Sequence, residues 1–249
     1  MVKPQDLANA CDHHLEAASF DDYCPNGLQV EGGRAVTRLA TGVTATLALI
    51  EAAAAWNADA LLVHHGWFWK GEPAPLVGMK GRRVRRLYEA GMSLLAYHLP
   101  LDAHPTLGNN AMLAKRLEIA DAEPDTAGGL LWRGRLQPSL SASEFSALIG
   151  KALERTPLHI PGGPDSIETL GWCTGAAQDY IGQAADLGLD AFLSGEISEP
   201  TVHVARERGI HYFAAGHHAT ERYGVQALGE WLAEKFGVEH KYFEMGNPV

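Results

Sequence analysis

Ala60-Leu61-Leu62-Val63-His64-His65-Gly66 is the stretch that decides the fold, because a short apolar run ends there in two histidines and a glycine. A run of this length matches one buried strand. An Ala-rich helical stretch, residues 46–56, precedes it, and a basic helical stretch, residues 80–90, follows it. Short apolar strands that alternate with helices predict a parallel or mixed sheet with helices on both faces.

The same alternation continues along the rest of the chain. Further strands are expected at residues 36–43, 92–97, 167–174, 191–193 and 210–215, and further helices at 109–117, 178–187 and 198–208. A last helix is expected to start within residues 216–221 and to run to residue 235. Residues 121–129 are rich in Pro, Gly and acidic side chains, which indicates a linker. The sequence therefore predicts an α/β protein of two halves, each with a mixed sheet flanked by helices.

The two halves also resemble each other. A shift of 131 positions places Leu39 on Leu170 and Asp59 on Asp190, with strands and helices in the same order. We interpret this order as two related α/β domains. The first is expected to comprise residues 1–124 and 216–249, and the second residues 125–215.

The composition excludes several classes of protein. Of the 249 residues, 46% are hydrophobic, which excludes general disorder, and the net charge of −10 disfavours a general nucleic-acid coat. No apolar run approaches the roughly 18 residues of a membrane helix, and the N-terminal residues carry no signal-peptide core. The three cysteines are widely spaced and form no Cys-x-x-Cys motif, so a reduced, cytoplasmic protein without membrane contact is expected.

Histidine is the residue type that stands out, with 12 copies and two adjacent pairs, His64-His65 and His217-His218. Both pairs follow an expected strand, and so do Asp102 and Glu196. In open α/β sheets, ligands bind beyond the carboxyl ends of the strands, so these side chains are expected to converge. Imidazole and carboxylate donors without thiolates indicate a metal site of nitrogen and oxygen ligands.

Each of these signals has a second interpretation when it is taken alone. His217 and Glu221 share a helix face, which suits a divalent metal, but a glutamate there also complements the helix dipole. His64 and His65 serve one site if the chain turns after them; otherwise one is buried and the other is on the surface. Asp102 suits either a metal ligand or an Asx turn. Together, three histidines and two carboxylates exceed the needs of one tetrahedral zinc and suit two metal ions about 3.5–4 Å apart.

Five motifs spread over nearly the whole chain carry a family resemblance. They are Asp22-Tyr23-Cys24-Pro25-Asn26-Gly27-Leu28-Gln29-Val30, His64-His65-Gly66, Leu99-Pro100-Leu101-Asp102 with Gly108-Asn109-Asn110, Ser194-Gly195-Glu196, and Gly216-His217-His218-Ala219-Thr220-Glu221. In combination they resemble the GTP cyclohydrolase 1 type 2 family, also called the NIF-three-like dinuclear metal centre family. The segment 121–165 is too short for the middle domain that the longest members insert.

The resemblance implies a fold, an assembly and a metal site. It implies two similar α/β domains, a toroidal homohexamer, and two divalent metal ions per chain. Fe, Mn, Zn, Ni and Co all suit imidazole and carboxylate donors. The metal ligands that the resemblance implies are His64, His65, Asp102, His217 and Glu221.

The resemblance also implies an activity. A water shared by two cations has a lowered pKa, which suits a metal-dependent hydrolase. The resemblance implies that its substrate is GTP, whose purine ring it would open. From their positions in the chain, Glu196 and His218 are the expected proton donors, with a structural role as the alternative for Glu196. His98 and His218 are expected to support the ligands or to lie in the core, with direct metal binding as the alternative. The alternatives are a nucleotide phosphoesterase with the same metals, and a metal-binding scaffold or regulatory adaptor without turnover. The basic stretch at residues 80–86 is interpreted as a solvated helix face, or as a surface for substrate phosphates or single-stranded nucleic acid.

Overall fold

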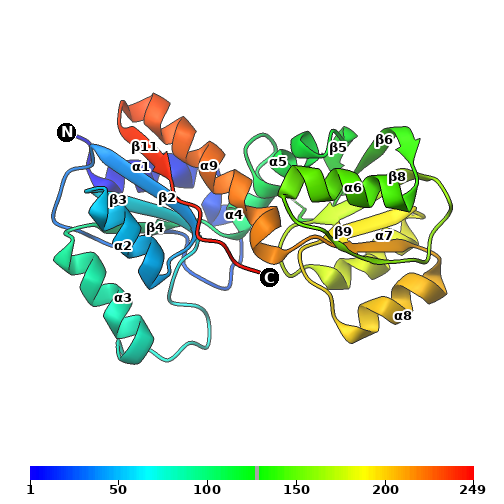
Figure 1. Cartoon of the computed structure of the whole chain (residues 1–249). Helices are drawn as coiled ribbons and strands as arrows, with labels where there is room; N and C mark the ends of the chain where they lie inside the picture. The colour runs from blue at the N-terminus through cyan, green and yellow to red at the C-terminus, as the bar shows by residue number, and fades with distance from the viewer. Residues whose placement is uncertain (127–128) are drawn as a thin grey trace. The chain divides into compact units, whose positions relative to one another are not determined.

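The computed structural model describes residues 1–126 and 129–249 of the chain. They form two compact units: unit 1 consists of Met1–Leu101 and Gly224–Met245, and unit 2 of Asp102–Tyr223 and Gly246–Val249. Each unit has its own β-sheet flanked by helices, which confirms the predicted fold class (Figure 1). No helix among the described residues is long and apolar enough to cross a membrane.

Unit 1 is built on a five-stranded sheet with the strand order β1-β4-β3-β2-β11. Its elements are α1 (Pro4–His14), η1 (Ala17–Ser19), β1 (Gly27–Val30), β2 (Arg38–Thr44), α2 (Leu47–Ala55), β3 (Ala60–His65), α3 (Gly78–Glu89), β4 (Ser93–Ala96) and β11 (Glu239–Tyr242). The strands β11, β2, β3 and β4 are parallel, and β1 is antiparallel to β4. The helices α4 (Leu99–Ala103) and α9 (His217–Phe236) contain residues of both units.

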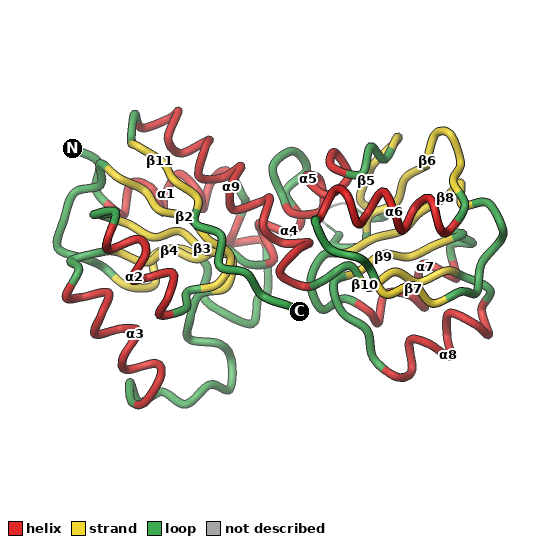
Figure 2. Tube along the Cα trace, viewed as in Figure 1, coloured by secondary structure: helices red, strands yellow, loops and turns green. Residues whose placement is uncertain are grey.

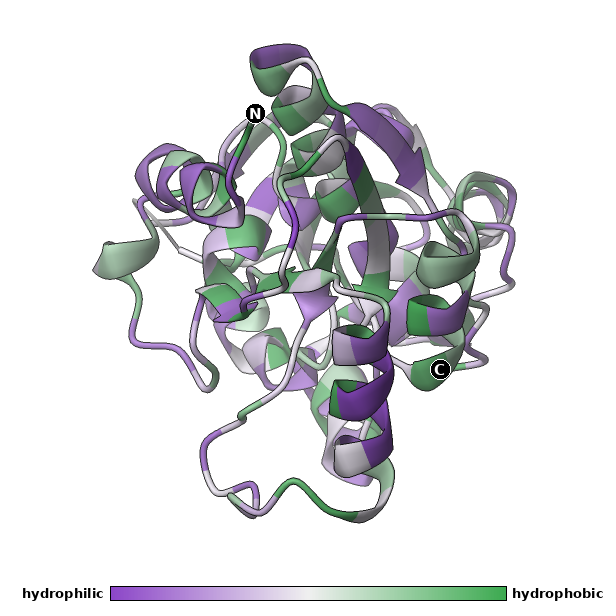
Figure 3. Ribbon diagram, turned by 90° about the vertical axis from the view of Figure 1, so that its left-hand side faces the viewer, coloured by the Kyte–Doolittle hydropathy of each residue, from purple (hydrophilic) through white to green (hydrophobic). Residues whose placement is uncertain are grey.

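The sequence explains why the helices of unit 1 form and which side they bury. Helix α2 begins after Thr46, whose hydroxyl accepts a hydrogen bond from the Leu49 N–H at 3.2 Å, as an N-cap does. Helix α3 is rich in cations but buries Val84 and Leu87 in the same apolar cluster as Leu49. Helix α3 accordingly carries its cations and its buried apolar residues on different sides, and Figure 3 shows hydrophilic and hydrophobic residues along the helices.

Unit 2 is built on a six-stranded sheet with the strand order β5-β6-β8-β9-β10-β7 (Figure 2). Its elements are α5 (Asn109–Arg116), β5 (Ala120–Pro124), β6 (Trp132–Leu140), α6 (Ala142–Leu153), β7 (Leu158–Ile160), β8 (Ile167–Cys173), η2 (Gln178–Tyr180), α7 (Ile181–Asp186), β9 (Ala191–Ser194), α8 (Glu199–Arg208) and β10 (His211–Ala214). The central strands β8, β9 and β10 are parallel. The outer pairs are antiparallel: β5 with β6, β6 with β8, and β7 with β10. Helix α6 packs into one apolar cluster, and α7 and α8 pack into a second.

The predicted internal repeat is visible in the strand register of the two units. In unit 1, Leu39 pairs with Ala60, and in unit 2 Leu170 pairs with Ala191, each 131 positions further on. Asp59 precedes β3, and its Oδ2 accepts hydrogen bonds from two main-chain N–H groups and one threonine hydroxyl at the start of β2. Asp190 does the same at the start of β8. Both aspartates therefore fasten equivalent strand starts.

The structure corrects the predicted linker and the predicted unit boundaries. Ala120–Pro124 is not a linker but strand β5, which pairs antiparallel with β6 and thereby joins unit 2. Every second residue of β5 is an exposed acidic side chain, and Glu123 accepts a hydrogen bond from Arg133 at 2.9 Å. The acidic content that indicated a linker therefore belongs to the exposed face of a strand. Residues 102–124, 216–223 and 246–249 belong to unit 2 rather than unit 1. Residues 127–128 of the predicted linker lie outside the described residues.

Candidate metal centre

Unit 1 brings three histidines together at the ends of two adjacent parallel strands. His64 and His65 end β3, and His98 follows β4. One ligand nitrogen from each imidazole lies within 4.8 Å of the others. The ring centroid of His64 lies 4.6 Å from that of His65 and 5.1 Å from that of His98. Unit 1 therefore offers a cluster of nitrogen donors that suits a metal ion.

Hydrogen bonds fix how the two predicted ligands of unit 1 present their rings. The Nδ1 of His64 lies 2.9 Å from the carbonyl oxygen of Tyr97, which can only accept, so Nδ1 carries the proton and Nε2 the lone pair. The Nδ1 of His65 lies 3.1 Å from the hydroxyl of Thr44. Metal-binding histidines are commonly oriented in this way, through a partner on the other ring nitrogen.

His98 is held by a carboxylate that the sequence analysis did not single out. The buried Oδ1 of Asp22 lies 2.7 Å from His98 Nδ1, and its Oδ2 accepts hydrogen bonds from Asn26 and the Leu99 N–H, both at 2.9 Å. Burial acts to raise the pKa of Asp22, but the hydrogen bonds from His98 and Asn26 outweigh it and lower this pKa to about 2. The motif around Asp22 thus positions His98, whose predicted supporting role stays a prediction.

Unit 2 brings the other three predicted ligands together. His217 and Glu221 lie one turn apart at the start of α9, with His217 Nε2 3.0 Å from Glu221 Oε2. The buried carboxylates of Asp102 and Glu221 have oxygens within 4.8 Å of each other. Asp102 Oδ1 accepts hydrogen bonds from Asn109 at 2.8 Å and Thr174 at 3.2 Å. Two carboxylates and one imidazole therefore form a second group of donors.

Glu196 lies behind His217, on the side away from Glu221. Its Oε1 is 2.7 Å from His217 Nδ1, so the imidazole lies between two carboxylates. Burial acts to lower the pKa of His217, but the hydrogen bonds and charges of Glu221 and Glu196 outweigh it and raise this pKa to about 9. The contact gives Glu196 a positioning role, and proton transfer by Glu196 stays a prediction.

A glycine that the sequence analysis passed over makes room for this arrangement. Gly175 follows β8 with φ +71°, and a Cβ there would collide with Glu221 Oε1 and approach His217 Nε2 to 3.4 Å. The Gly175 N–H donates to the Thr220 hydroxyl at 3.1 Å, in the first turn of α9. The signal available in the sequence was the dipeptide Thr174-Gly175, which places a glycine at the turn directly after the expected strand 167–174.

The cysteines do not act as ready thiolate donors. Cys24 lies near Asp22 and His98, but burial and the charge of Asp22 raise the pKa of its thiol to about 12. Burial, followed by the charges of Asp102 and Glu221, raises the pKa of Cys173 well above its usual value. Both thiols are therefore protonated near neutral pH in the metal-free chain.

Two further candidates from the sequence have local roles. His218 is buried, and its main-chain N–H donates to the Val249 carbonyl oxygen at 3.0 Å; its expected role as proton donor stays a prediction. In the basic stretch at residues 80–86, the Lys80 ammonium lies 3.0 Å from Glu72 and 4.7 Å from the centre of the Phe68 ring. At least this cation of the stretch is engaged within unit 1.

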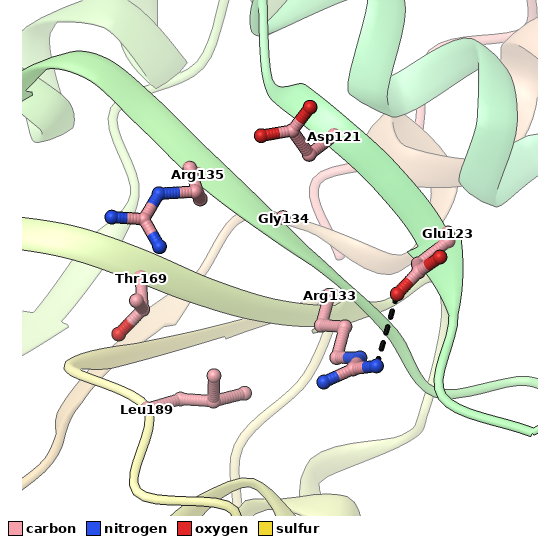
Figure 4. A pocket seen from close by; sticks show the side chains of 7 residues that line it. All are labelled: Asp121, Glu123, Arg133, Gly134, Arg135, Thr169 and Leu189. Atoms are coloured by element: carbon pink, nitrogen blue, oxygen red, sulfur yellow. Dashed lines mark hydrogen bonds and ion pairs between the residues drawn. The ribbon is translucent and has the colours of Figure 1, made fainter.

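Unit 2 also carries a hollow that is separate from the histidines, with a volume of about 180 Å³ (Figure 4). Arg133 and Arg135 line it from β6, and both guanidinium groups meet acidic partners. Arg133 lies 2.9 Å from Glu123, and Arg135 contacts Glu168. The charges of this hollow are compensated by their neighbours, so it does not resemble the donor groups described above.

Comparison with known proteins gives a consistent result over the whole chain. A family model described as "Duf34/NIF3 (NGG1p interacting factor 3)" matches residues 2–248. Proteins of Allochromatium vinosum and Vibrio cholerae, both named "GTP cyclohydrolase 1 type 2 homolog", are each 59% identical; the first alignment covers 100% of this chain and 98% of the relative, the second 94% and 95%.

Solved structures agree with this result. A structure titled "protein ybgI, unknown function" is 44% identical, with a TM-score of 0.96 over 100% of both chains. The structure of TTHA1606 from Thermus thermophilus is 34% identical, with a TM-score of 0.91 over 100% of both chains.

Proposed function

Because the chain belongs to the Duf34/NIF3 family, we propose that it is a metal-dependent hydrolase that opens the purine ring of GTP. The proposed ligands are His64, His65, Asp102, His217 and Glu221, which bind two divalent ions per chain. The names of the relatives support the substrate, and the donor chemistry supports the metals.

The observation that carries the proposal is the environment of His217. Its Nδ1 faces the carboxylate of Glu196 at 2.7 Å, and its Nε2 faces the carboxylate of Glu221 at 3.0 Å. A neutral imidazole has only one N–H, so both contacts are satisfied together only when a cation accompanies the ring. A proton serves in the metal-free chain, and a divalent ion held by His217 and Glu221 would take its place. The residues present therefore fit a metal ion.

The surrounding residues prepare the donors for this role. Tyr97 and Glu196 accept the Nδ1 protons of His64 and His217, which leaves Nε2 of each ring as the ligand atom. Asn109 and Thr174 hold the carboxylate of Asp102 in one orientation. When bound, divalent ions lower the pKa of water and stabilise developing negative charge.

Removing a ligand tests the metal site against a matched control. Glu221→Ala is expected to lower bound metal sharply, because it deletes a buried carboxylate donor. Glu199→Ala is the control, since Glu199 forms the same i,i+4 pair with His203 at 2.8 Å but on the exposed face of α8. Elemental analysis of both purified variants reads the result. Equal metal content in the two variants would contradict the ligand assignment.

The activity is tested on metal-loaded wild-type protein with GTP. Formate and phosphate are measured separately, since ring opening with loss of the C8 carbon releases formate and a phosphoesterase releases phosphate. Formate release above the level of metal ions alone is expected. Protein that holds two metal ions per chain but releases no formate would refute the cyclohydrolase activity and leave the metal site standing.

A further inference from the structure

Unit 1 contains a group of donors outside the proposed ligand set, formed by the loop before β1 and the end of β4. It consists of Asp22, Cys24 and His98, and one ligand atom from each lies within 4.8 Å of the others. Cys24 is 6% exposed, and the side chains of Asp22 and His98 are 3% and 13% exposed. Carboxylate, thiolate and imidazole are the donor types that zinc takes in proteins.

Hydrogen bonds hold this group together before any ion binds. Asp22 Oδ2 accepts from the Leu99 N–H at 2.9 Å, which ties the loop 22–26 to the end of β4. Asn26 makes a second connection, because its side-chain amide donates to Asp22 Oδ2 at 2.9 Å and accepts from the His98 N–H at 2.8 Å. Since the loop is already held in place, binding of an ion requires little further ordering of the chain.

The charges of the group suit a divalent cation. The Cys24 thiol holds its proton in the metal-free chain, and an ion that binds there displaces this proton to solvent. The carboxylate of Asp22 and the resulting thiolate then carry two negative charges, which a divalent ion balances, so that no uncompensated charge is buried. Tyr23, which lies between the two donors in the sequence, is 62% exposed, so the group is close to the surface of unit 1.

From this arrangement we propose that Asp22, Cys24 and His98 form a third metal site, which binds a borderline-soft divalent cation such as Zn²⁺. The thiolate distinguishes it from the proposed two-ion centre, whose donors are imidazole and carboxylate, because thiolates favour softer ions. The group supplies three donors, and a tetrahedral ion takes water in the fourth position. His98 also belongs to the group of His64 and His65, so the third site shares a residue with that cluster.

The test adds Co²⁺ to the metal-free, full-length chain and records its absorption. Co²⁺ takes the place of Zn²⁺ at tetrahedral sites, and a bound cysteine thiolate gives it a near-ultraviolet charge-transfer band that imidazole and carboxylate ligands do not give. The wild-type chain is expected to show this band, and Zn²⁺ is expected to abolish it by displacing Co²⁺, since Zn²⁺ binds such donors more tightly. Absence of the band from wild-type protein saturated with Co²⁺ would overturn the assignment.

Variants identify the thiolate and its partner. Cys24→Ser and Cys24→Ala are both expected to lose the band. Cys173→Ser is the matched control and is expected to keep it, since Cys173 is also buried and also lies near carboxylates. Asp22→Asn is expected to weaken Co²⁺ binding, followed by the band, at least about 10-fold, because loss of even a supporting partner costs that much. A band that persists in both Cys24 variants, a band lost in Cys173→Ser, or unchanged affinity in Asp22→Asn would contradict the proposal.

Glu221→Ala separates the third site from the proposed two-ion centre. It removes a proposed ligand of unit 2 and none of the three donors of this group, so the variant is expected to keep the thiolate band while it loses other bound metal. Loss of the band in Glu221→Ala would overturn the third site as a separate one.

Discussion

Gly175→Ala is the substitution that probes the donor group of unit 2 most directly. Gly175 has φ +71°, and a methyl group there would collide with Glu221 Oε1. Gly188 has the same φ of +71°, yet a Cβ there would meet nothing within 4 Å. Both variants place an alanine in the left-handed region, so Gly188→Ala is the control for backbone strain.

The two variants are expected to differ in how much stability they lose as well as in whether they keep their metal. The left-handed conformation costs an alanine about 1–2 kcal/mol, and we expect Gly188→Ala to lose that amount and to keep its metal. Gly175→Ala pays the same strain and also displaces the buried Glu221 carboxylate from its partners, a further loss of about 1–3 kcal/mol. A chain of this size loses about 2–4 °C in Tm per kcal/mol, so calorimetry resolves the difference.

The metal content of the two purified variants decides the question. Gly175→Ala is expected to lose most of its bound metal, because Glu221 can no longer face His217. If Gly175→Ala retains metal and stability equal to those of Gly188→Ala, the reasoning that Gly175 makes room for a ligating carboxylate is wrong.

Two further predictions concern residues that support the fold and the site. Asp22→Asn is expected to make the stability of the chain less sensitive to acid. The pKa of Asp22 is lowered from 3.8 to about 2, so the ionised carboxylate stabilises the folded chain by about 2 kcal/mol. This stabilisation is complete above about pH 4 and is lost as the pH falls through about 2. Urea unfolding at pH 7 and pH 2 checks this, and an unchanged pH dependence in the variant would count against it. Asp59→Ala and Asp190→Ala are each expected to destabilise the chain by about 3 kcal/mol, because each substitution leaves two main-chain N–H groups without their hydrogen-bond acceptor. A marked effect of only one of them would contradict the equivalence of the two units.

The strands could be predicted from the sequence where an apolar run has the length of a strand. β3 is a continuous apolar run, and the prediction of 60–63 falls inside Ala60–His65. β5 was not predictable in this way, because Ala120–Pro124 has a proline, two acidic residues and no large apolar side chain. Its identity as a strand comes from pairing with β6, a tertiary contact that local composition does not report.

The candidate site was predictable as a set of donors but not as an arrangement. The spacing of His217 and Glu221 predicts a shared helix face, and their contact at 3.0 Å agrees with it. No local pattern connects Asp22 with His98, which are 76 positions apart and meet because the loop before β1 reaches the end of β4. Gly175 was equally hidden, since its role depends on a side chain 46 positions later.

The internal repeat explains why these supporting residues fall where they do. The shift that places Asp59 on Asp190 also places Thr44 on Gly175 and His65 on Glu196. In unit 1 the strand ends supply a proposed ligand, His65, with Thr44 against its Nδ1. In unit 2 the equivalent positions supply the space for Glu221 and the carboxylate behind His217. The same pair of strand ends therefore provides a donor in one unit and the support for donors in the other.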